Sequence, residues 1–257
     1  MPFFKVENLL IRFGGLTALN NVSFQVEENS TYSIIGPNGA GKTSLFNCIS
    51  GIYRPDMGRI IFKGEDITGF KPHKIAGKGI ARTFQNVELF SHMTTLDNLL
   101  LGRHFHMKTN ILNGAFLTRK VIKEEVYNRE VVERIIDFLD LQSARNQLVT
   151  NLPFGTRRLV ELGRALALEP KLLLLDEPSA GMNLEEKEDL IIWIQDIKED
   201  FGITIILIEH DMKLVMDISD RVLALNCGEK ITEGLPFEVQ HNREVLKAYL
   251  GEEDTVA

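Results

Sequence analysis

Residues 36–43 constrain the fold more than any other part of this sequence. They read Gly-Pro-Asn-Gly-Ala-Gly-Lys-Thr and match the phosphate-binding pattern G-x-x-x-x-G-K-[ST] at every fixed position. The glycines let the backbone turn tightly and bring its N–H groups against phosphate oxygens. The apolar run Thr31–Ile35 precedes the loop and the helix-like run Ser44–Ile49 follows it, so the loop is predicted to lie at a helix N-terminus, where anions are favoured. A glycine-rich turn without a ligand is the alternative, and the flanking strand and helix argue against it.

The side chains of this loop predict nucleotide binding. Lys42 can reach the β- and γ-phosphates of a nucleoside triphosphate, and the Thr43 hydroxyl can ligate magnesium. The predicted nucleotide contacts are Gly36, Pro37, Asn38, Gly39, Ala40, Gly41, Lys42, Thr43 and Ser44.

A second pattern places two acids at the end of an apolar strand. Leu172–Leu175 is followed by Asp176 and Glu177, and ligands of open α/β sheets bind at the carboxyl ends of the strands. Asp176 is predicted to hold magnesium, directly or through water, and Glu177 to polarise an attacking water as general base. A pair of solvated acids at a strand end is the alternative, which the phosphate loop upstream disfavours.

Composition narrows the functional classes. The chain has 257 residues, 44% of them hydrophobic, and a net charge of −7. The negative net charge argues against nucleic acid or an anionic membrane surface as the main partner.

Cys48 and Cys227 show no pairing or metal-ligand spacing, which fits a reducing compartment; both are expected to be small buried residues. We see neither a signal peptide nor an apolar run of about 20 residues, so any work at a membrane is expected of a peripheral subunit.

The pattern along the chain predicts one α/β domain. Alternating strands are expected at 3–9, 22–27 and 59–63, and fully apolar strands at 171–175 and 203–208 with a helix at 185–200 between them. A helical pattern runs from about 96 to 167, including 121–141, and the end holds strands at 221–225 and 230–233 and one helix at 236–250. We therefore expect a parallel core sheet with an antiparallel β edge, formed by 1–86 and 167–257, and an inserted helical subdomain at about 87–166.

With these two patterns the chain resembles the ATP-binding subunit of ABC transporters, with a P-loop NTPase fold. The resemblance implies ATP and Mg²⁺ as ligands and adds three site residues. Phe13 lies where the family has an aromatic ring that stacks on adenine, although such a residue is more often part of a core. Gln85 lies at the Q-loop position, which reaches the metal and the water, and His210 at the switch histidine, which contacts the γ-phosphate and holds Glu177's water. The resemblance implies Glu177, His210, Gln85 and Lys42 as catalytic residues and Thr43, Gln85 and Asp176 as metal ligands.

The family's signature segment departs from its usual form here. Leu-Ser-Gly-Gly-Gln is usual, and this chain has Leu152, Pro153, Phe154, Gly155 and Thr156. The serine hydroxyl is missing and Pro153 lacks an N–H, but proline suits a helix start. Our hypothesis is that the segment binds the γ-phosphate in the partner's ATP site through backbone N–H groups and the helix dipole, together with the Thr156 hydroxyl; a weaker composite site is the alternative.

Within the family the resemblance is to one of the two ATPases of branched-chain amino acid importers. It is carried by the Leu-Pro-aromatic-Gly signature, the segments at 12–19, 82–85, 102–129, 176–183 and 208–216, and the ending at 248–252. This implies a place on the cytoplasmic face of the inner membrane, two integral membrane permease subunits, a second ABC ATPase chain or a second copy of this one, and a solute-binding protein as indirect partner. A urea or amide importer, a lipid exporter, a soluble ABC ATPase and a non-catalytic regulatory partner are the alternatives.

Overall fold

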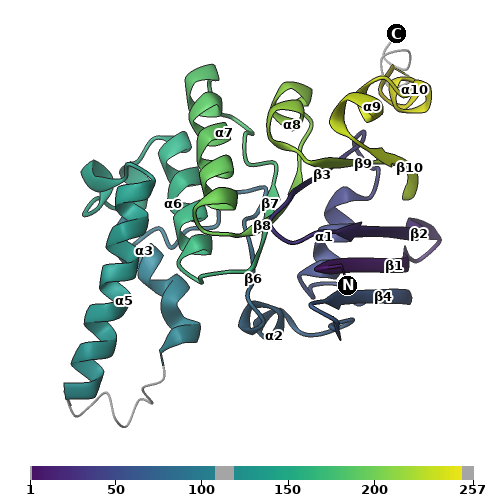
Figure 1. Ribbon diagram of the computed structural model, residues 1–257. Coiled ribbons are helices and arrows are strands. Elements are labelled where there is room, and N and C mark those ends of the chain that lie inside the picture. The colour runs from purple at the N-terminus through teal and green to yellow at the C-terminus, as the bar shows by residue number, and fades with distance from the viewer. Residues whose placement is uncertain (1, 108–118, 251–257) are drawn as a thin grey trace. The chain divides into compact units, whose positions relative to one another are not determined.

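The computed structural model describes residues 2–107 and 119–250 (Figure 1). Met1, 108–118 and 251–257 lie outside the described residues, and with them part of the 102–129 segment and of the 248–252 ending. The chain divides into two compact units, Met1–Arg82 with Lys171–Ala257, and Thr83–Pro170. None of the described helices has the length and hydrophobicity that crossing a bilayer requires.

The first unit is built on a six-stranded sheet in the order β10-β9-β3-β8-β7-β6. All of its strand pairs are parallel except β10 with β9 at the edge. Every residue of β3, β7 and β8 is buried, as expected for strands covered on both faces. The strands are β3 (Thr31–Ile35), β6 (Ile80–Arg82), β7 (Leu172–Asp176), β8 (Thr204–Ile208), β9 (Arg221–Asn226) and β10 (Glu229–Gly234).

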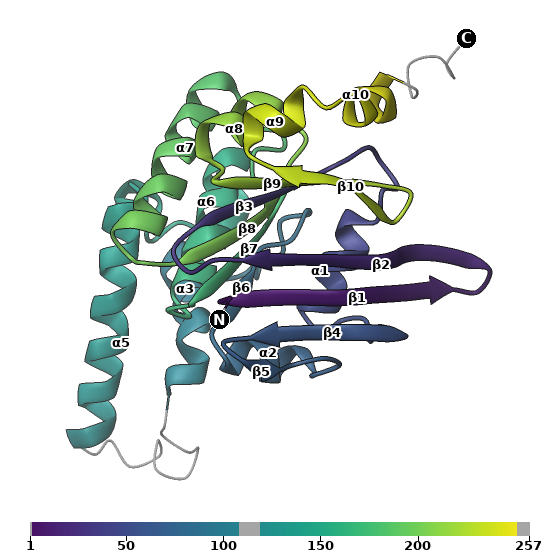
Figure 2. The ribbon, with the colours of Figure 1, turned by 45° about the vertical axis from the view of Figure 1, so that its right-hand side comes forward.

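A second, antiparallel sheet has the order β2-β1-β4-β5, and Figure 2 shows β2, β1 and β4 lying side by side. Its strands are β1 (Phe4–Phe13), β2 (Leu16–Val26), β4 (Met57–Phe62) and β5 (Glu65–Asp66), and helix α2 (Pro72–Gly77) follows them. Helix α1 (Lys42–Ile49) joins both sheets in one core, because Leu45 and Phe46 belong to the same buried cluster as Leu9 of β1 and Ile206 of β8. The helix that starts in the phosphate loop is thus fixed from two sides.

The other face of the six-stranded sheet is covered by α7 (Leu184–Glu199), α8 (Met212–Ile218), α9 (Pro236–Gln240) and α10 (Arg243–Leu250) (Figure 2). A small cluster joins Val215 of α8 and Val239 of α9 to Ile35 at the end of β3. The expectation of one helix over 236–250 is wrong. The helix breaks at His241, and the Asn242 side chain accepts bonds from the N–H groups of Glu244 and Val245 to start a new one.

The second unit is helical. It contains α3 (Thr95–Gly102), α5 (Arg119–Phe138), α6 (Phe154–Leu166) and the short 3-10 turns η1 (Arg103–His106), η2 (Gln142–Ala144) and η3 (Val149–Asn151). Its interior holds Arg103, fully buried, whose guanidinium donates to Asn128 (3.0 Å), the Ala167 carbonyl (2.8 Å) and Glu169 (2.7 Å). The sheets and this helical part confirm the predicted fold class.

The cysteines differ from expectation in one case. Cys48 is buried in α1, and burial raises the pKa of its thiol to about 12. Cys227 is exposed, so the expectation that both are buried is wrong. It lies between β9 and β10, in the turn of their hairpin, and has a φ of 47°.

Candidate nucleotide site

The phosphate loop follows β3 and ends in α1, as predicted. Gly41 has a φ of 98°, and a Cβ there would lie 2.5 Å from the Ala18 carbonyl oxygen, so only glycine fits. Gly36 likewise has a φ of 151° and approaches the Leu225 carbonyl closely. Asn38 and Gly39 are exposed at the crest of the loop. These close approaches and positive φ angles restrict both positions to glycine.

Lys42 is folded back onto its own loop. Its Nζ donates to the carbonyl oxygens of Gly36 (2.5 Å) and Pro37 (3.0 Å), and the residue is only 7% exposed. Thr43 is exposed beside it and Ser44 is half-buried. The ammonium group therefore already lies inside the curve that the phosphates would enter.

Asp176 closes β7 and forms a buried ion pair that the sequence did not indicate. Its Oδ2 accepts a hydrogen bond from Arg82 Nη2 at 2.8 Å, and the two side chains are 2% and 6% exposed. Arg82 also donates to Asn47 Oδ1 (2.7 Å) and Ser50 Oγ (2.8 Å) of α1 and its end. The Arg82 guanidinium thus links β7, which carries Asp176, to α1, the helix that starts in the phosphate loop.

Glu177 and His210 come together at the ends of β7 and β8. His210 Nδ1 lies 4.0 Å from Glu177 Oε2, and the histidine side chain is 60% exposed. Glu177 has a φ of 48°, and its N–H donates to the Ile208 carbonyl at 3.0 Å. The positive φ is uncommon for a residue other than glycine, and functional sites are among the places where it is found.

Glu209 immediately precedes His210 in the chain, and the sequence did not single it out. It is fully buried, and its carboxylate accepts from the N–H groups of Ser179, His210 and Asp211. Its position directly after an apolar strand and before a candidate histidine was the available signal.

Phe13 lies at the end of β1 and is 44% exposed. Its ring packs edge-on against Tyr53 with the centroids 5.0 Å apart. A half-exposed aromatic ring held by a second one offers a face for a flat ligand.

Two predicted elements lie in the helical unit. Gln85 is exposed, and its carbonyl and that of Phe84 accept bonds from Arg158 of α6, while the Phe84 N–H donates to Glu161 at 3.1 Å. Burial raises the pKa of Glu161. The segment before the helices is thus anchored to α6.

The signature segment forms the start of that same helix. Pro153 is the N-cap of α6 and its side chain makes no capping bond. Leu152 and Gly155 are buried, Phe154 is exposed and Thr156 is half-buried. As predicted, a helix starts at this proline: Pro153 is the N-cap, and α6 begins at Phe154.

A metal at this site would depend on the nucleotide. Among the described residues, no group of three or more His, Cys, Asp and Glu could hold a metal. The hydroxyl of Thr43 and the carboxylate of Asp176 are the hard oxygen ligands that Mg²⁺ prefers, with phosphate oxygens completing its shell. The residues therefore fit magnesium as a companion of a bound nucleotide.

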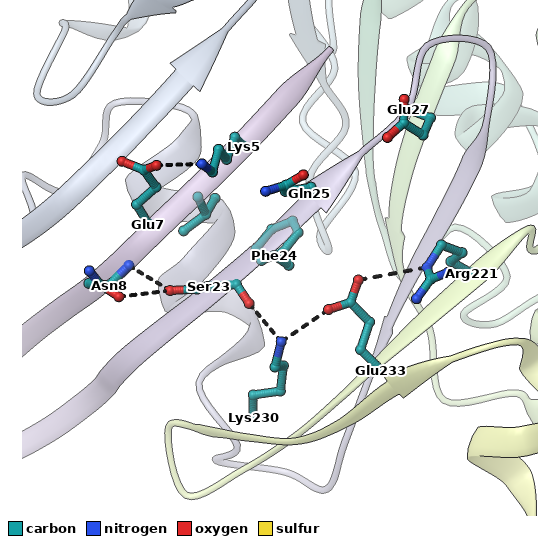
Figure 3. Close-up of a pocket in the computed structure, with 11 residues that line it drawn as sticks. Lys5, Glu7, Asn8, Ser23, Phe24, Gln25, Glu27, Arg221, Lys230 and Glu233 are labelled. Atoms are coloured by element: carbon teal, nitrogen blue, oxygen red, sulfur yellow. Dashed lines mark hydrogen bonds and ion pairs between the residues drawn. The ribbon is translucent and has the colours of Figure 1, made fainter. Parts of the chain in front are cut away.

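A hollow of about 660 Å³ elsewhere in the first unit contains none of the predicted site residues (Figure 3). It lies over β1, β2, β9 and β10, and most of its charged groups pair with one another: Lys5 with Glu7, and Lys230 and Arg221 with Glu233. Glu27 is the other charged residue of the lining.

Two family models and several curated relatives match this chain. A model of ABC transporters matches residues 19–180, and one of branched-chain amino acid ATP-binding cassette transporters matches 229–255. The chain is 44% identical over 251 residues to the high-affinity branched-chain amino acid transport ATP-binding protein BraF of Pseudomonas aeruginosa, and 40% identical over 254 residues to LivG of Escherichia coli. Each alignment covers 98% of both chains.

Solved structures of ABC transporter cassettes share the fold. One in its ADP conformation has a TM-score of 0.84 at 34% identity and covers 98% of this chain and 99% of its own. A nucleotide-free cassette has a TM-score of 0.84 at 33% identity, with 97% and 99% covered. The chain therefore belongs to the ABC transporter family and is one of its ATP-hydrolysing cassettes.

Proposed function

We propose that this chain powers the import of branched-chain amino acids from the cytoplasmic face of the inner membrane. One observation supports the catalytic part: the phosphate loop, Asp176, Glu177 and His210 all lie at the carboxyl ends of neighbouring parallel strands, where α/β sheets bind ligands. The names of relatives with 98% coverage support the solute class.

The residues divide the reaction among them. Lys42 exchanges its loop carbonyl partners for the β- and γ-phosphates and offsets the charge that develops on the γ-phosphoryl group. Glu177 accepts the proton of the attacking water, and His210, 4.0 Å away, contacts the γ-phosphate and holds that water in line. Phe13 stacks on the adenine, and the Gln85 side chain contacts the metal and the attacking water.

Magnesium, held by Thr43, Asp176 and Gln85, would neutralise phosphate charge when the nucleotide is bound. Asp176 must then share its carboxylate between that ion and Arg82.

Each ATP site is composite. The chain supplies the phosphate loop and acids to one site and its signature, 152–156, to the site of the other ATPase. That other chain is a sister subunit or a second copy. ATP closes the pair, and hydrolysis removes the charge that holds it closed, so the cycle drives two integral membrane permeases. The solute-binding protein acts through the permeases.

The catalytic part is tested by two variants in the purified transporter. Lys42→Ala should lose nucleotide affinity, because it removes the charge that lies inside the loop. Glu177→Gln should keep ATP binding and lose turnover. Unchanged nucleotide binding in the first, or turnover within a few-fold of wild type in the second, would refute the assignment.

The solute is tested by uptake. A strain lacking this chain should fail to take up labelled leucine, and the wild-type gene, but not Lys42→Ala, should restore uptake. Normal leucine uptake combined with lost urea uptake would favour the urea importer instead, and a defect in outward lipid traffic would favour the exporter.

A further inference from the structure

Glu209 is a fully buried acid to which the proposed mechanism gives no role. It follows β8 directly and precedes His210. Charged side chains are almost never fully buried unless they are paired or hydrogen-bonded, so the contacts of this carboxylate explain its place.

The two oxygens of Glu209 serve two different loops. Oε1 accepts from the Ser179 N–H at 2.9 Å, in the loop after β7. Oε2 accepts from the His210 N–H at 3.1 Å and the Asp211 N–H at 3.4 Å, in the loop after β8. Hydrogen bonds to a charged acceptor are stronger than neutral ones, so the side chain acts as a clasp between the loops.

The two loops carry the two groups whose separation matters for hydrolysis. Ser179 is two residues after Glu177, and the Ala180 N–H donates to the Glu177 carbonyl at 3.1 Å, so this loop turns back on itself. On the other loop His210 reaches to 4.0 Å from Glu177 Oε2. A shift of one loop against the other would change that distance.

We propose that Glu209 is a positioning residue that sets the separation of Glu177 and His210 by holding both loops with one carboxylate. The proposal rests on the roles given to Glu177 and His210 above. Both bonded loops belong to the same compact unit, so the clasp works within one chain. It leaves phosphate binding, which depends on Lys42 and its loop, to other residues.

Glu209→Gln is the decisive variant because it preserves shape and removes one acceptor. A single amide oxygen can serve Ser179 or the His210 side, and the NH₂ group then faces a backbone N–H. In the ATPase complex, kcat should fall about tenfold or more because the reacting groups are displaced, while the KM for ATP stays within about threefold. Hydrogen exchange should rise in the peptide covering 177–183, in that covering 209–214, or in both.

Lys187→Met is the matched control. It removes a 2.7 Å ion pair to the Asp211 side chain and leaves the Glu209 carboxylate and the backbone N–H groups that bond to it in place. We expect its kcat to stay within about twofold of wild type. Glu209→Asp keeps both oxygens on a shorter arm and should also lower kcat, because it cannot span both loops.

Three results would overturn the proposal. One is a Glu209→Gln kcat within twofold of wild type. Another is unchanged exchange in both peptides. The third is a parallel loss of ATP binding and turnover with a lower melting temperature, which indicates a purely structural acid. A wild-type complex without ATPase activity would refute the proposed function and this proposal with it. That result is obtained before any variant is measured, so it is distinguished from a failure of the Glu209 proposal alone.

Discussion

At the scale of single residues, Arg82 and Asp176 form a buried ion pair. The side chains are 6% and 2% exposed, so replacing Arg82 removes a counter-charge from a carboxylate that has little contact with solvent. We expect Arg82→Met to lower the free energy of unfolding by about 3 kcal/mol in the absence of nucleotide and magnesium. Urea denaturation of the wild type and the variant measures this loss.

A double-mutant cycle isolates the pair. Asp176→Asn removes the negative charge that loses its counter-charge in Arg82→Met. The double variant should therefore be more stable than the sum of the two single losses predicts. Losses that simply add would contradict a coupled pair. Asn47 and Ser50 remain in every variant, so their bonds to Arg82 are lost equally wherever Arg82 is replaced.

Contiguity decides how much of the site the sequence could predict. Lys42 and its loop are eight adjacent positions, and Asp176 and Glu177 close an apolar run, so both are visible as patterns. Arg82 and Asp176 are 94 positions apart, and no local signal pairs them. Glu209 follows a strand as many exposed acids do, and its burial depends on the fold of the loop after β7.

Between elements, Asp211 ties α8 to α7. Its side chain accepts from the N–H groups of Lys213 and Leu214 at the start of α8 and binds Lys187 of α7 at 2.7 Å. The hydrogen bond from Lys187 lowers the pKa of Asp211 below its ordinary 3.8. A lowered carboxyl pKa stabilises the fold above the ordinary value, and this contribution is lost as the pH falls through the folded pKa.

Asp211→Asn keeps the helix cap and removes the ion pair. We expect a loss of about 0.5–1 kcal/mol at neutral pH, and the difference from wild type should narrow as the pH falls below about 4. Urea midpoints measured across this range give the answer. Lys198→Met, which breaks a looser 3.4 Å pair between α7 and Asp220, should show a smaller effect; an equal loss would mean that pairing distance is irrelevant here.

The N-terminus of α6 tests the unusual signature. Pro153→Ser restores a hydroxyl that can cap the helix and contact phosphate. Because backbone N–H groups at the helix start already bind anions, one added hydrogen bond of about 1 kcal/mol should change ATP hydrolysis less than tenfold. Steady-state ATPase assays of the complex measure it. A rise well beyond tenfold would show that the natural signature is crippled.

Helices and strands could be predicted where a short stretch of sequence carried a clear hydrophobic pattern. Alternating and fully apolar runs predicted β1, β3, β7 and β8 within a few residues of their observed bounds. The break between α9 and α10 was missed because apolar spacing continues across it. Asn242, a strong helix N-cap, was the signal that could have located it.

In the whole molecule, the chain forms two compact units, and the sequence shows this only as a change of pattern. The change from strand-like to helix-like spacing suggested boundaries near 87 and 166, whereas the compact units divide after Arg82 and before Lys171. β6 (Ile80–Arg82), the last element before the first of these divisions, is too short to show any periodicity, so no pattern in the sequence marks where the first unit ends.

A cassette that completes its ATP site with a second chain should be trapped when hydrolysis stops. Glu177→Gln removes the proposed base and leaves the phosphate contacts of Lys42, so ATP should hold the closed pair instead of being consumed. We expect the tagged variant, treated with ATP in native membranes and gently solubilised, to bring down a sister ATPase and two polytopic membrane proteins. Lys42→Ala, which cannot hold the phosphates, is the control and should retain the membrane proteins but not a closed ATPase pair. Recovery of a second copy of this chain alone would indicate a homodimeric motor, and recovery of ribosomes or DNA would contradict a transporter.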